Sequence, residues 1–380
     1  MRKISNRFWY TLHGWSAMPI WALFCFICLT GTLAVMSHEI TWLLNPNARA
    51  TNPEQLPAKS AAELVRLFRQ AHPTSDVSSV MTYEDYMVNV VNFSDRGKPL
   101  HRAYINQYTG DIQEISSGQT FIGFMRKLHG WLLFPWQQGY SIGYYLVSAM
   151  GIVMLGSLVS GLMIYKQFWR AFYVPKLRFH QGTKTLLTDL HRLAGVWSIW
   201  FILLMSLSGI WYLVQGILSH NEIELHEYAP VAKVAVLPNQ RQDFKVNLSQ
   251  ALQIAQQQYP QIALKFARMP EHQRDNFYFY GSGEEIFFDS FSYRVAVNPW
   301  TGDVMQAQSP QNMNALQMVK HIVNPLHYGT FGGIWTKIVW FIFGVLLTGM
   351  SLTGCLMWRK KLVQVKQQVL SAEEGMHGAA

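Results

Sequence analysis

The first long uncharged stretch of this chain is FWYTLHGWSAMPIWALFCFICLTGTLAVMSH, residues 8–38, which contains no Asp, Glu, Lys or Arg. About 20 predominantly apolar residues suffice to cross the hydrocarbon core of a bilayer, so this stretch predicts a membrane span. Three more uncharged stretches of sufficient length follow, at residues 128–165, 193–221 and 338–358. The first of these three is too long for one helix, and Pro135 divides it into an interfacial segment and a helix near residues 142–165. The sequence therefore predicts an α-helical membrane protein with a bundle of four spans.

The composition fits apolar spans separated by polar segments. Half of the 380 residues (50%) are hydrophobic and only 14% are charged, yet the mean hydropathy is close to zero at +0.06. Soluble domains carry about 25% charged residues, so an ordinary soluble enzyme and a disordered chain are both excluded. Three cysteines are too few for a disulfide scaffold. The abundance of Trp, Tyr and Phe favours a protein with aromatic belts at the membrane interfaces.

Basic residues gather at one set of span ends. They precede span 1, fill the connection between spans 2 and 3, and follow span 4: Arg2, Lys3, Arg7, Lys166, Arg170, Lys176, Arg178, Lys184, Arg359, Lys360, Lys361 and Lys366. Loops rich in Lys and Arg stay in the cytoplasm, so both termini are predicted to be cytoplasmic. The net charge of +9 then reflects orientation in a bacterial inner membrane, and no nucleic acid is expected as a partner. The first apolar run resembles a signal peptide but lacks a small-residue cleavage site, so we expect it to be retained.

These boundaries predict eight consecutive segments. They are residues 1–44, the cytoplasmic N-terminus and span 1; 45–127, a first periplasmic domain; 128–166, an outer interfacial segment and span 2; 167–188, a basic cytoplasmic loop; 189–221, span 3; 222–320, a second periplasmic domain; 321–358, an outer interfacial segment and span 4; and 359–380, a cytoplasmic tail that is short and featureless after Lys366. Both periplasmic domains are predicted to be α+β, each with an amphipathic helix (Ser60–Ala71 and Leu248–Gln258), short strands and a final hairpin.

The two halves of the chain repeat the same motifs in the same order. The first set is Leu12-His13, Leu29-Thr30-Gly31, Thr109-Gly110-Asp111, Leu128-His129 and Val159-Ser160-Gly161. The second set is Leu190-His191, Leu207-Ser208-Gly209, Thr301-Gly302-Asp303, Leu326-His327 and Leu352-Thr353-Gly354. Both halves start on the same side of the membrane. The sequence therefore predicts a parallel internal duplication with a pseudo-two-fold axis along the membrane normal.

Four histidines occupy matching positions of the two halves. His13 and His191 begin spans 1 and 3 near the cytoplasmic face, while His129 and His327 precede spans 2 and 4 near the outer face. A neutral imidazole is a strong ligand for haem iron, and a polar ring inside a bundle is costly unless it is used. Under two-fold symmetry each pair can meet across the axis, which predicts two bis-histidine sites, one per leaflet, for two b haems. A single interfacial histidine is more often a headgroup contact or a helix cap, and direct binding of iron or zinc is a further alternative.

Weaker candidates surround these four. His38 and His220, at the outer ends of spans 1 and 3, are alternative ligands of the outer site, and His321 is an alternative to His327. Arg126 and Arg192 lie at the interfaces and could pair with haem propionates, as could Lys127, Lys320 and Lys337, although basic residues often snorkel there. Six glycines either leave room for a porphyrin or mark close helix contacts: Gly14, Gly31, Gly161, Gly195, Gly209 and Gly354.

Jointly these motifs resemble those of the PepSY-associated transmembrane family over residues 5–362. The overall plan is similar to that of inner-membrane ferric-siderophore (ferrioxamine) reductases of the FoxB type. The resemblance implies two haem b (protohaem IX) groups held by the four histidines, PepSY-like periplasmic domains, and reduction of Fe(III) in a hydroxamate siderophore during iron uptake. Gly14 stands where relatives often carry Arg, which puts a basic contact to haem at that position in doubt. No flavin or nicotinamide module follows span 4, so we expect a separate electron donor, a quinol or a cytosolic reductase.

Two functions of other classes stay open beside the reductase. One is a PepSY-type binding or regulatory protein without redox activity, whose spans serve as anchors. The other is an importer of a metal chelate, which would need a polar path through the midplane where the spans offer only Ser, Thr and Gly. The reductase needs no catalytic acid or base, because its reaction is a one-electron transfer.

Overall fold

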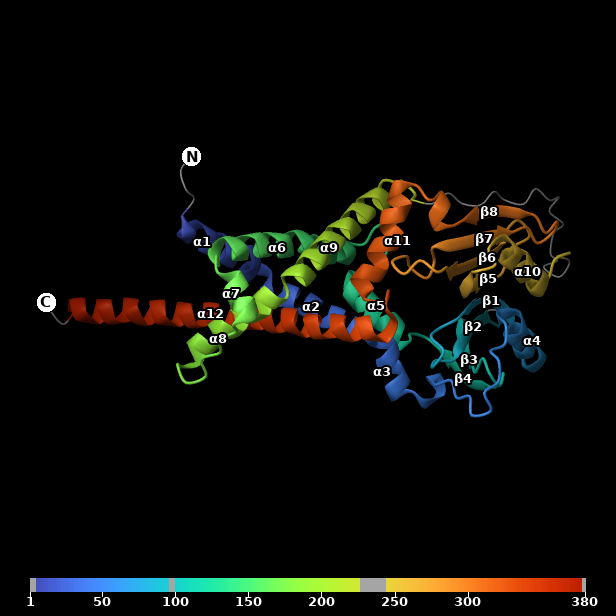
Figure 1. Ribbon diagram of the computed structural model, residues 1–380, viewed down its shortest axis with the longest axis horizontal. Coiled ribbons are helices and arrows are strands. Elements are labelled where there is room, and N and C mark those ends of the chain that lie inside the picture. The colour runs from blue at the N-terminus through green and yellow to red at the C-terminus, as the bar shows by residue number, and fades with distance from the viewer. Residues whose placement is uncertain (1–4, 96–99, 226–243, 378–380) are drawn as a thin grey trace.

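The computed structural model describes residues 5–95, 100–225 and 244–377. The molecule is elongated, with a helical bundle at one end and a β-sheet at the other (Figure 1). We call these the far end and the sheet end of the bundle. Arg2 and Lys3, two of the basic residues used to predict orientation, lie outside the described residues, as does part of the predicted second polar domain.

Four helical segments in the described part of the chain are long and apolar enough to cross a membrane: Asn6–Val35, Ile142–Ile164, Ile199–His220 and Gly333–Val363. The prediction of a multi-pass membrane protein with four spans is confirmed. The second span is α6 (Ile142–Ile164), which follows a separate helix α5 (Phe121–Trp131), as the split at Pro135 predicted. The short helix α7 (Phe168–Tyr173) follows it.

The other three spans are interrupted or extended. The first consists of α1 (Asn6–Ala17), a 3₁₀ turn (Met18–Ile20) containing Pro19, and α2 (Trp21–Val35), and α3 (Ser37–Leu44) follows directly. Pro19 lacks the N–H that a continuous helix needs, which accounts for the break. The third span is α9 (Ile199–His220), which directly follows α8 (Thr183–Trp197), and the fourth lies within α12 (Gly333–His377), which is preceded by α11 (Ala315–Tyr328).

The C-terminal segment differs from the prediction. Span 4 was expected to end at Trp358 and the tail after Lys366 to be featureless, but α12 continues without interruption to His377. The segment contains Ala, Glu, Gln, Leu and Lys in the proportions typical of a helix, and neither Pro nor a glycine before Gly375 interrupts it. The sequence prediction ended span 4 at its first charged residue, Arg359, which marks the end of the apolar core and not the end of the helix.

The helices of the bundle pack in crossed pairs. Helix α6 lies along α9, and α12 lies along both α2 and α8. Helix α1 packs on α6, α5 on α2 and α6, and α11 on α9. Helices α6 and α9 approach each other closely, because a Cβ added to Gly151 would lie 2.8 Å from the backbone N of Ile210 and the backbone O of Ser206. Small residues therefore set the separation of spans 2 and 3.

The polar segments share one antiparallel sheet of eight strands in the order β4-β3-β2-β1-β5-β6-β7-β8. The strands are β1 (Asp76–Met81), β2 (Asn89–Ser94), β3 (His101–Ile105), β4 (Ile112–Ser117), β5 (Ala263–Arg268), β6 (Phe277–Ser282), β7 (Tyr293–Val297) and β8 (Val304–Gln308). The predicted α+β units thus meet edge to edge, because β1 pairs with β5 with Val80 opposite Ala267. This pairing covers one edge of each half-sheet.

Two helices cover one face of the sheet and share its core. They are α4 (Ala61–Ala71) and α10 (Leu248–Gln258), the amphipathic helices expected from the sequence. Ser60 caps α4 and Asn247 caps α10, the latter in a full capping box with Gln250. The buried core runs without a break from Leu64 and Phe68 on α4 to Leu252 on α10. The Thr-Gly-Asp turns close the β3–β4 and β7–β8 hairpins with positive φ at Gly110 and Gly302.

The close contact of spans 2 and 3 gives a first prediction. We expect Gly151→Val to lower the thermal unfolding temperature of the detergent-solubilised protein, because overpacking a well-packed contact costs about 1–3 kcal/mol. Gly156 lies on the same helix and has no atom within 4 Å of an added Cβ, so Gly156→Val is the matched control. Equal melting temperatures for the two variants would contradict this packing.

Candidate functional site

The structure brings the four repeated histidines together in two pairs. At the far end, His13 on α1 and His191 on α8 have ring centroids 6.3 Å apart, with the ring planes at 87°. At the sheet end, His129 on α5 and His327 on α11 have centroids 6.4 Å apart, with the planes at 27°. Each pair contains one histidine from each half of the chain, which is the juxtaposition expected from the sequence.

At the far end, backbone carbonyls define which ring nitrogen carries the proton. His13 Nδ1 lies 3.1 Å from the Ser157 carbonyl oxygen, and His191 Nδ1 lies 3.0 Å from that of Met350. A carbonyl oxygen only accepts, so Nδ1 is the donor in both neutral rings. A hydroxyl completes each contact, Ser160 Oγ at 3.0 Å from His13 and Thr353 Oγ1 at 3.2 Å from His191.

Hydroxyls play the same part at the sheet end. His129 Nδ1 lies 3.3 Å from Thr30 Oγ1, and His327 Nδ1 lies 2.7 Å from Ser208 Oγ. Both hydroxyls already donate to backbone carbonyls of their own helices, Thr30 to Phe26 and Ser208 to Leu204. Each hydroxyl is therefore left to accept the Nδ1–H of its histidine.

All four imidazoles consequently present an unprotonated Nε2. Metal-ligating histidines almost always donate their other ring N–H to a carbonyl, a carboxylate or a similar acceptor, which fixes the ring and increases its basicity. A metal–imidazole bond is about 2.0 Å long, so two rings that share one metal through Nε2 have centroids about 6 Å apart. The observed 6.3 and 6.4 Å fit that spacing.

The chemistry of the donor set favours a metal that brings most of its own ligands. Within the described residues no group of three or more His, Cys, Asp or Glu side chains is placed to hold a metal ion. Two opposed imidazoles complete the coordination of an iron whose other four ligands belong to a porphyrin, whereas a bare zinc or iron ion needs further protein ligands. The residues present therefore fit haem iron better than a bare ion.

Three of the six glycines predicted to border a porphyrin lie beside these rings, whereas an added Cβ at Gly14 would meet Trp358 and one at Gly195 would meet Met350. An added Cβ would approach the imidazole of His129 at Gly31, that of His13 at Gly161 and that of His191 at Gly354. Gly209 instead abuts Gly151 in the α6–α9 contact. Each of the four glycines Gly31, Gly161, Gly209 and Gly354 follows a hydroxyl residue that holds a histidine, namely Thr30, Ser160, Ser208 and Thr353. The sequence analysis found the four Ser/Thr-Gly motifs but missed the role of their hydroxyls.

Aromatic side chains of α9 and α12 pack against one another. Trp200 and Phe201 on α9 pack against Trp340 and Phe343 on α12, with ring centroids 4.8 to 5.7 Å apart. Trp340 Nε1 also donates to the carbonyl oxygen of Leu326, the neighbour of His327, at 2.8 Å. The matching space between α2 and α6 holds smaller side chains with one aromatic ring, Phe24, Ile27 and Met150.

The weaker histidine candidates have other partners. His38 Nδ1 contacts Glu84 at 2.9 Å, His220 stacks on Tyr140 at 4.5 Å, and His321 Nδ1 contacts Asp289 at 2.7 Å. Of the two arginines, Arg192 lies over the ring of Tyr165 and Arg126 is exposed on α5. The geometry thus sets His129 opposite His327, and His38, His220 and His321 lie outside that pair.

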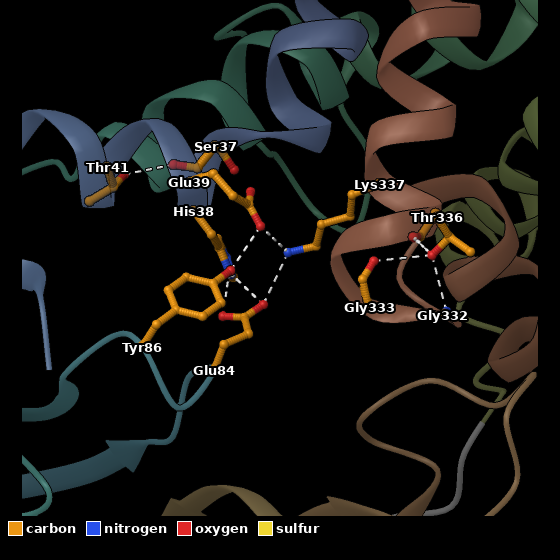
Figure 2. A network of polar contacts seen from close by, with 11 residues as sticks. Ser37, His38, Glu39, Thr41, Glu84, Tyr86, Gly332, Gly333, Thr336 and Lys337 are labelled. Carbon is orange, nitrogen blue, oxygen red and sulfur yellow. Dashed lines mark hydrogen bonds and ion pairs between the residues drawn. The ribbon is translucent and has the colours of Figure 1, made fainter. Parts of the chain in front are cut away.

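A second polar cluster, which the sequence analysis missed, ties the sheet to the bundle (Figure 2). Lys337 at the start of α12 is buried and donates to Glu39 at 2.9 Å and to Glu84 at 3.1 Å. Tyr86 donates to Glu39 at 2.8 Å, and His38 contacts Glu84. Glu39 lies on α3, whereas Glu84 and Tyr86 lie between β1 and β2, so the cluster joins three elements. Lys337 is therefore engaged by carboxylates, which argues against its predicted contact with a propionate.

The environment of Glu84 stabilises its charged form. Burial opposes ionisation, but the hydrogen bond and charge of His38 and the charge of Lys337 outweigh it and hold the pKa of Glu84 well below its usual range. Burial beside the carboxylates of Glu84 and Glu39 raises the pKa of Tyr86, so this phenol stays a donor. Glu84 and Lys337 are thus both charged at neutral pH, whereas Glu39 Oε2 is buried without a hydrogen-bond partner in the described structure.

Comparison with known proteins gives one family. The family model described as the PepSY-associated TM region matches residues 10–361, almost the whole chain. A search of curated proteins finds no match.

The low pKa of Glu84 predicts acid sensitivity. Stability from this group is present above the unfolded-state pKa of about 4.3 and is lost as the pH falls toward the folded-state value. We expect Glu84→Gln to cost about 1–3 kcal/mol at pH 7, because the side chain is 33% exposed and solvent screens part of the interaction. The variant should also lose less stability than the parent between pH 5 and pH 3, measured as the unfolding temperature against pH. Glu63→Gln, at an exposed site on α4, is the control. If Glu84→Gln and the parent lost the same stability between pH 5 and pH 3, the low pKa of Glu84 would be refuted.

Proposed function

The chain belongs to the PepSY-associated transmembrane family, and from this premise we propose that it is an inner-membrane di-haem b ferric-siderophore reductase. In this proposal His13 and His191 hold one haem b, His129 and His327 hold the other, and the protein reduces Fe(III) chelates in the periplasm to release iron. The observation that carries the proposal is the common state of the four rings: two pairs at metal-sharing distance, every Nδ1–H donated and every Nε2 left for a ligand.

The proposed orientation follows the basic residues. The far end of the bundle would face the cytoplasm, and the sheet end the periplasm, because the α6–α8 connection and the part of α12 beyond the apolar core carry the Lys and Arg residues. We further propose that the two halves arose by parallel duplication. The histidine–hydroxyl contacts support this, since each contact of the first half has a counterpart of the same kind in the second.

Each part of the protein has a distinct task in this reaction. Protohaem IX would supply a one-electron iron couple at each pair, tuned by its axial ligands, burial and hydrogen bonds. The carbonyls of Ser157 and Met350 and the four hydroxyls hold the imidazoles in the ligating tautomer. The bundle holds the pairs apart: α12 contacts His191 at Met350 and reaches the sheet-end pair at Trp340, ten residues or about 15 Å earlier along the helix.

The reaction balances as single-electron steps. Each Fe(III) chelate takes one electron and becomes an Fe(II) chelate, whose hard oxygen ligands bind the softer, less charged ion more weakly. A quinol donor would lose two electrons and two protons and so serve two chelates in turn, whereas a cytosolic reductase would deliver its electrons at the far end. No side chain needs to transfer a proton to the substrate.

Absorbance spectroscopy tests the cofactor and its ligands. We expect the purified protein to show a Soret band and sharp α bands on reduction, with two haems per chain. His13→Ala or His191→Ala should remove the far-end haem, and His129→Ala or His327→Ala the sheet-end haem, each halving the haem content by pyridine haemochrome assay. His220→Ala, whose ring stacks on Tyr140 at the sheet end, is the control and should retain both haems. A protein without haem would refute the proposal and favour a PepSY-type binding protein or an importer.

A second experiment tests the activity. The dithionite-reduced protein, freed of excess reductant, should be reoxidised by a ferric trihydroxamate, with Fe(II) trapped by a chromogenic chelator at one ion per haem oxidised. We expect His129→Ala to abolish this electron transfer, because the site next to the substrate face is lost, although the far-end haem remains reducible. Full reoxidation of the His129→Ala protein at the parent rate would contradict the proposed path.

A further inference from the structure

We propose that the segment between spans 2 and 3, residues 165–184, is a binding site for an anionic phospholipid of the leaflet at the far end of the bundle. The segment contains α7 and the connection to α8. In this site Lys166, Arg170 and Lys176 hold the phosphate of the headgroup, and exposed aromatic rings contact the acyl chains. The inference goes beyond the proposed reductase function and does not depend on haem.

The segment begins where the second span ends. The helix that is apolar enough to cross the membrane ends at Ile164, and α7 begins at Phe168. In Figure 1, α7 runs across the direction of α6, so it lies along the plane of the membrane and not through it. A helix in this position, next to the end of a span, lies at the level of the phospholipid headgroups.

Two contacts with α8 hold the segment at this level. Arg192 lies over the ring of Tyr165, 5.6 Å from its centroid, at the start of the segment. Toward the other end, Arg178 donates from Nη2 to Asp189 Oδ1 at 2.7 Å and from Nε to Oδ2 at 2.9 Å, a bidentate pair. The backbone N–H of Arg178 donates to the same carboxylate at 3.1 Å. The basic residues between these two contacts are therefore carried by a segment that is fixed on both sides.

The charge of the segment has one sign. Asp189 is the sole acidic residue between positions 115 and 221, and its carboxylate is already paired. This part of the chain therefore offers no second carboxylate to Lys166, Arg170 and Lys176, which are all exposed. Basic residues directly beside the end of a span attract anionic headgroups, because the surface of the leaflet is negative.

Exposed aromatic side chains accompany these cations. Trp169 is 64% exposed and Tyr173 is 74% exposed, and Phe172 and Phe179 are exposed as well. Indole and phenol rings are favoured at a membrane interface, where their apolar part meets acyl chains and their polar atom meets headgroups. Cations interleaved with such rings fit a phospholipid, which offers phosphate beside hydrocarbon, better than a soluble acidic protein.

The cations select the class of headgroup. Phosphatidylglycerol carries a net negative charge, whereas the choline of phosphatidylcholine cancels the charge of its phosphate. Each Lys or Arg near an anionic surface contributes about a fivefold factor in affinity. The segment is therefore expected to prefer phosphatidylglycerol, while its aromatic rings contact the acyl chains of both lipids alike.

Native mass spectrometry of the full chain tests this preference. The detergent-solubilised protein is titrated with phosphatidylglycerol or with phosphatidylcholine of the same acyl chains, and the affinity of the first bound lipid is measured. We expect the parent to bind phosphatidylglycerol more tightly. Lys166→Gln/Arg170→Gln/Lys176→Gln should weaken this binding about tenfold to a hundredfold, the effect of removing three cations, and should leave phosphatidylcholine binding unchanged.

A second triple variant is the matched control. Arg66→Gln/Arg69→Gln/Lys245→Gln removes the same number of exposed cations from α4 and from the residues before α10. This variant should bind both lipids as the parent does. The unfolding temperature of each variant in phosphatidylcholine nanodiscs reports whether the fold is intact.

Fluorescence quenching locates the lipid independently of charge. Phosphatidylglycerol brominated on its acyl chains should quench Trp169, so the parent in nanodiscs should lose more emission than Trp169→Phe. Equal parent affinity for the two lipids, equal phosphatidylglycerol affinity of the two triple variants, or equal quenching of the parent and Trp169→Phe would each overturn the proposal. Lipid affinity that survives the Lys166, Arg170 and Lys176 substitutions would assign this surface to a soluble acidic partner instead.

Discussion

The hydrogen bond from each half-buried histidine of the two pairs to a neighbouring helix is the constraint on which the bundle depends. An imidazole N–H in an apolar interior costs several kcal/mol unless it is paired, so each histidine must face an acceptor on another helix. His13 thereby joins α1 to α6, His191 joins α8 to α12, His129 joins α5 to α2, and His327 joins α11 to α9. The four contacts that fix the orientation of the rings also set which helices are neighbours.

The pseudo-symmetry of these contacts makes the departures from it informative. The two pairs use the same residue types at matching positions, but the planes of their rings differ, 87° at the far end and 27° at the sheet end. Bulky aromatic rings gather between α9 and α12 and not between α2 and α6, and the long β6–β7 loop has no counterpart of its length in the first half. The last two of these differences both lie on the second half of the chain.

Local patterns in the sequence predicted the elements well, and relations between distant elements poorly. Uncharged runs located the spans, and the caps at Ser60 and Asn247 located α4 and α10, because both features depend on residues a few positions apart. The pairing of β1 with β5 depends on how two segments about 180 residues apart meet, and no periodicity encodes it. The same applies to Lys337, whose partners Glu39 and Glu84 lie nearly 300 and about 250 residues away. The histidine pairs were predictable because the repeat reduced a long-range question to a comparison of two halves.

The Lys337 cluster gives the sheet its fixed place above the sheet-end pair. The buried Lys337 ammonium needs its carboxylate partners, because a buried charge without a partner is strongly destabilising. Its contacts with Glu39 and Glu84 therefore hold both α3 and the β1–β2 segment to α12. One turn further along α12, Trp340 donates to the residue next to His327 and packs on Phe331. The β1–β5 pairing then carries this anchorage across to the second half of the sheet. The sheet and the sheet-end histidine pair are therefore positioned by a single helix, and a change in the Lys337 cluster would shift the sheet relative to the histidines.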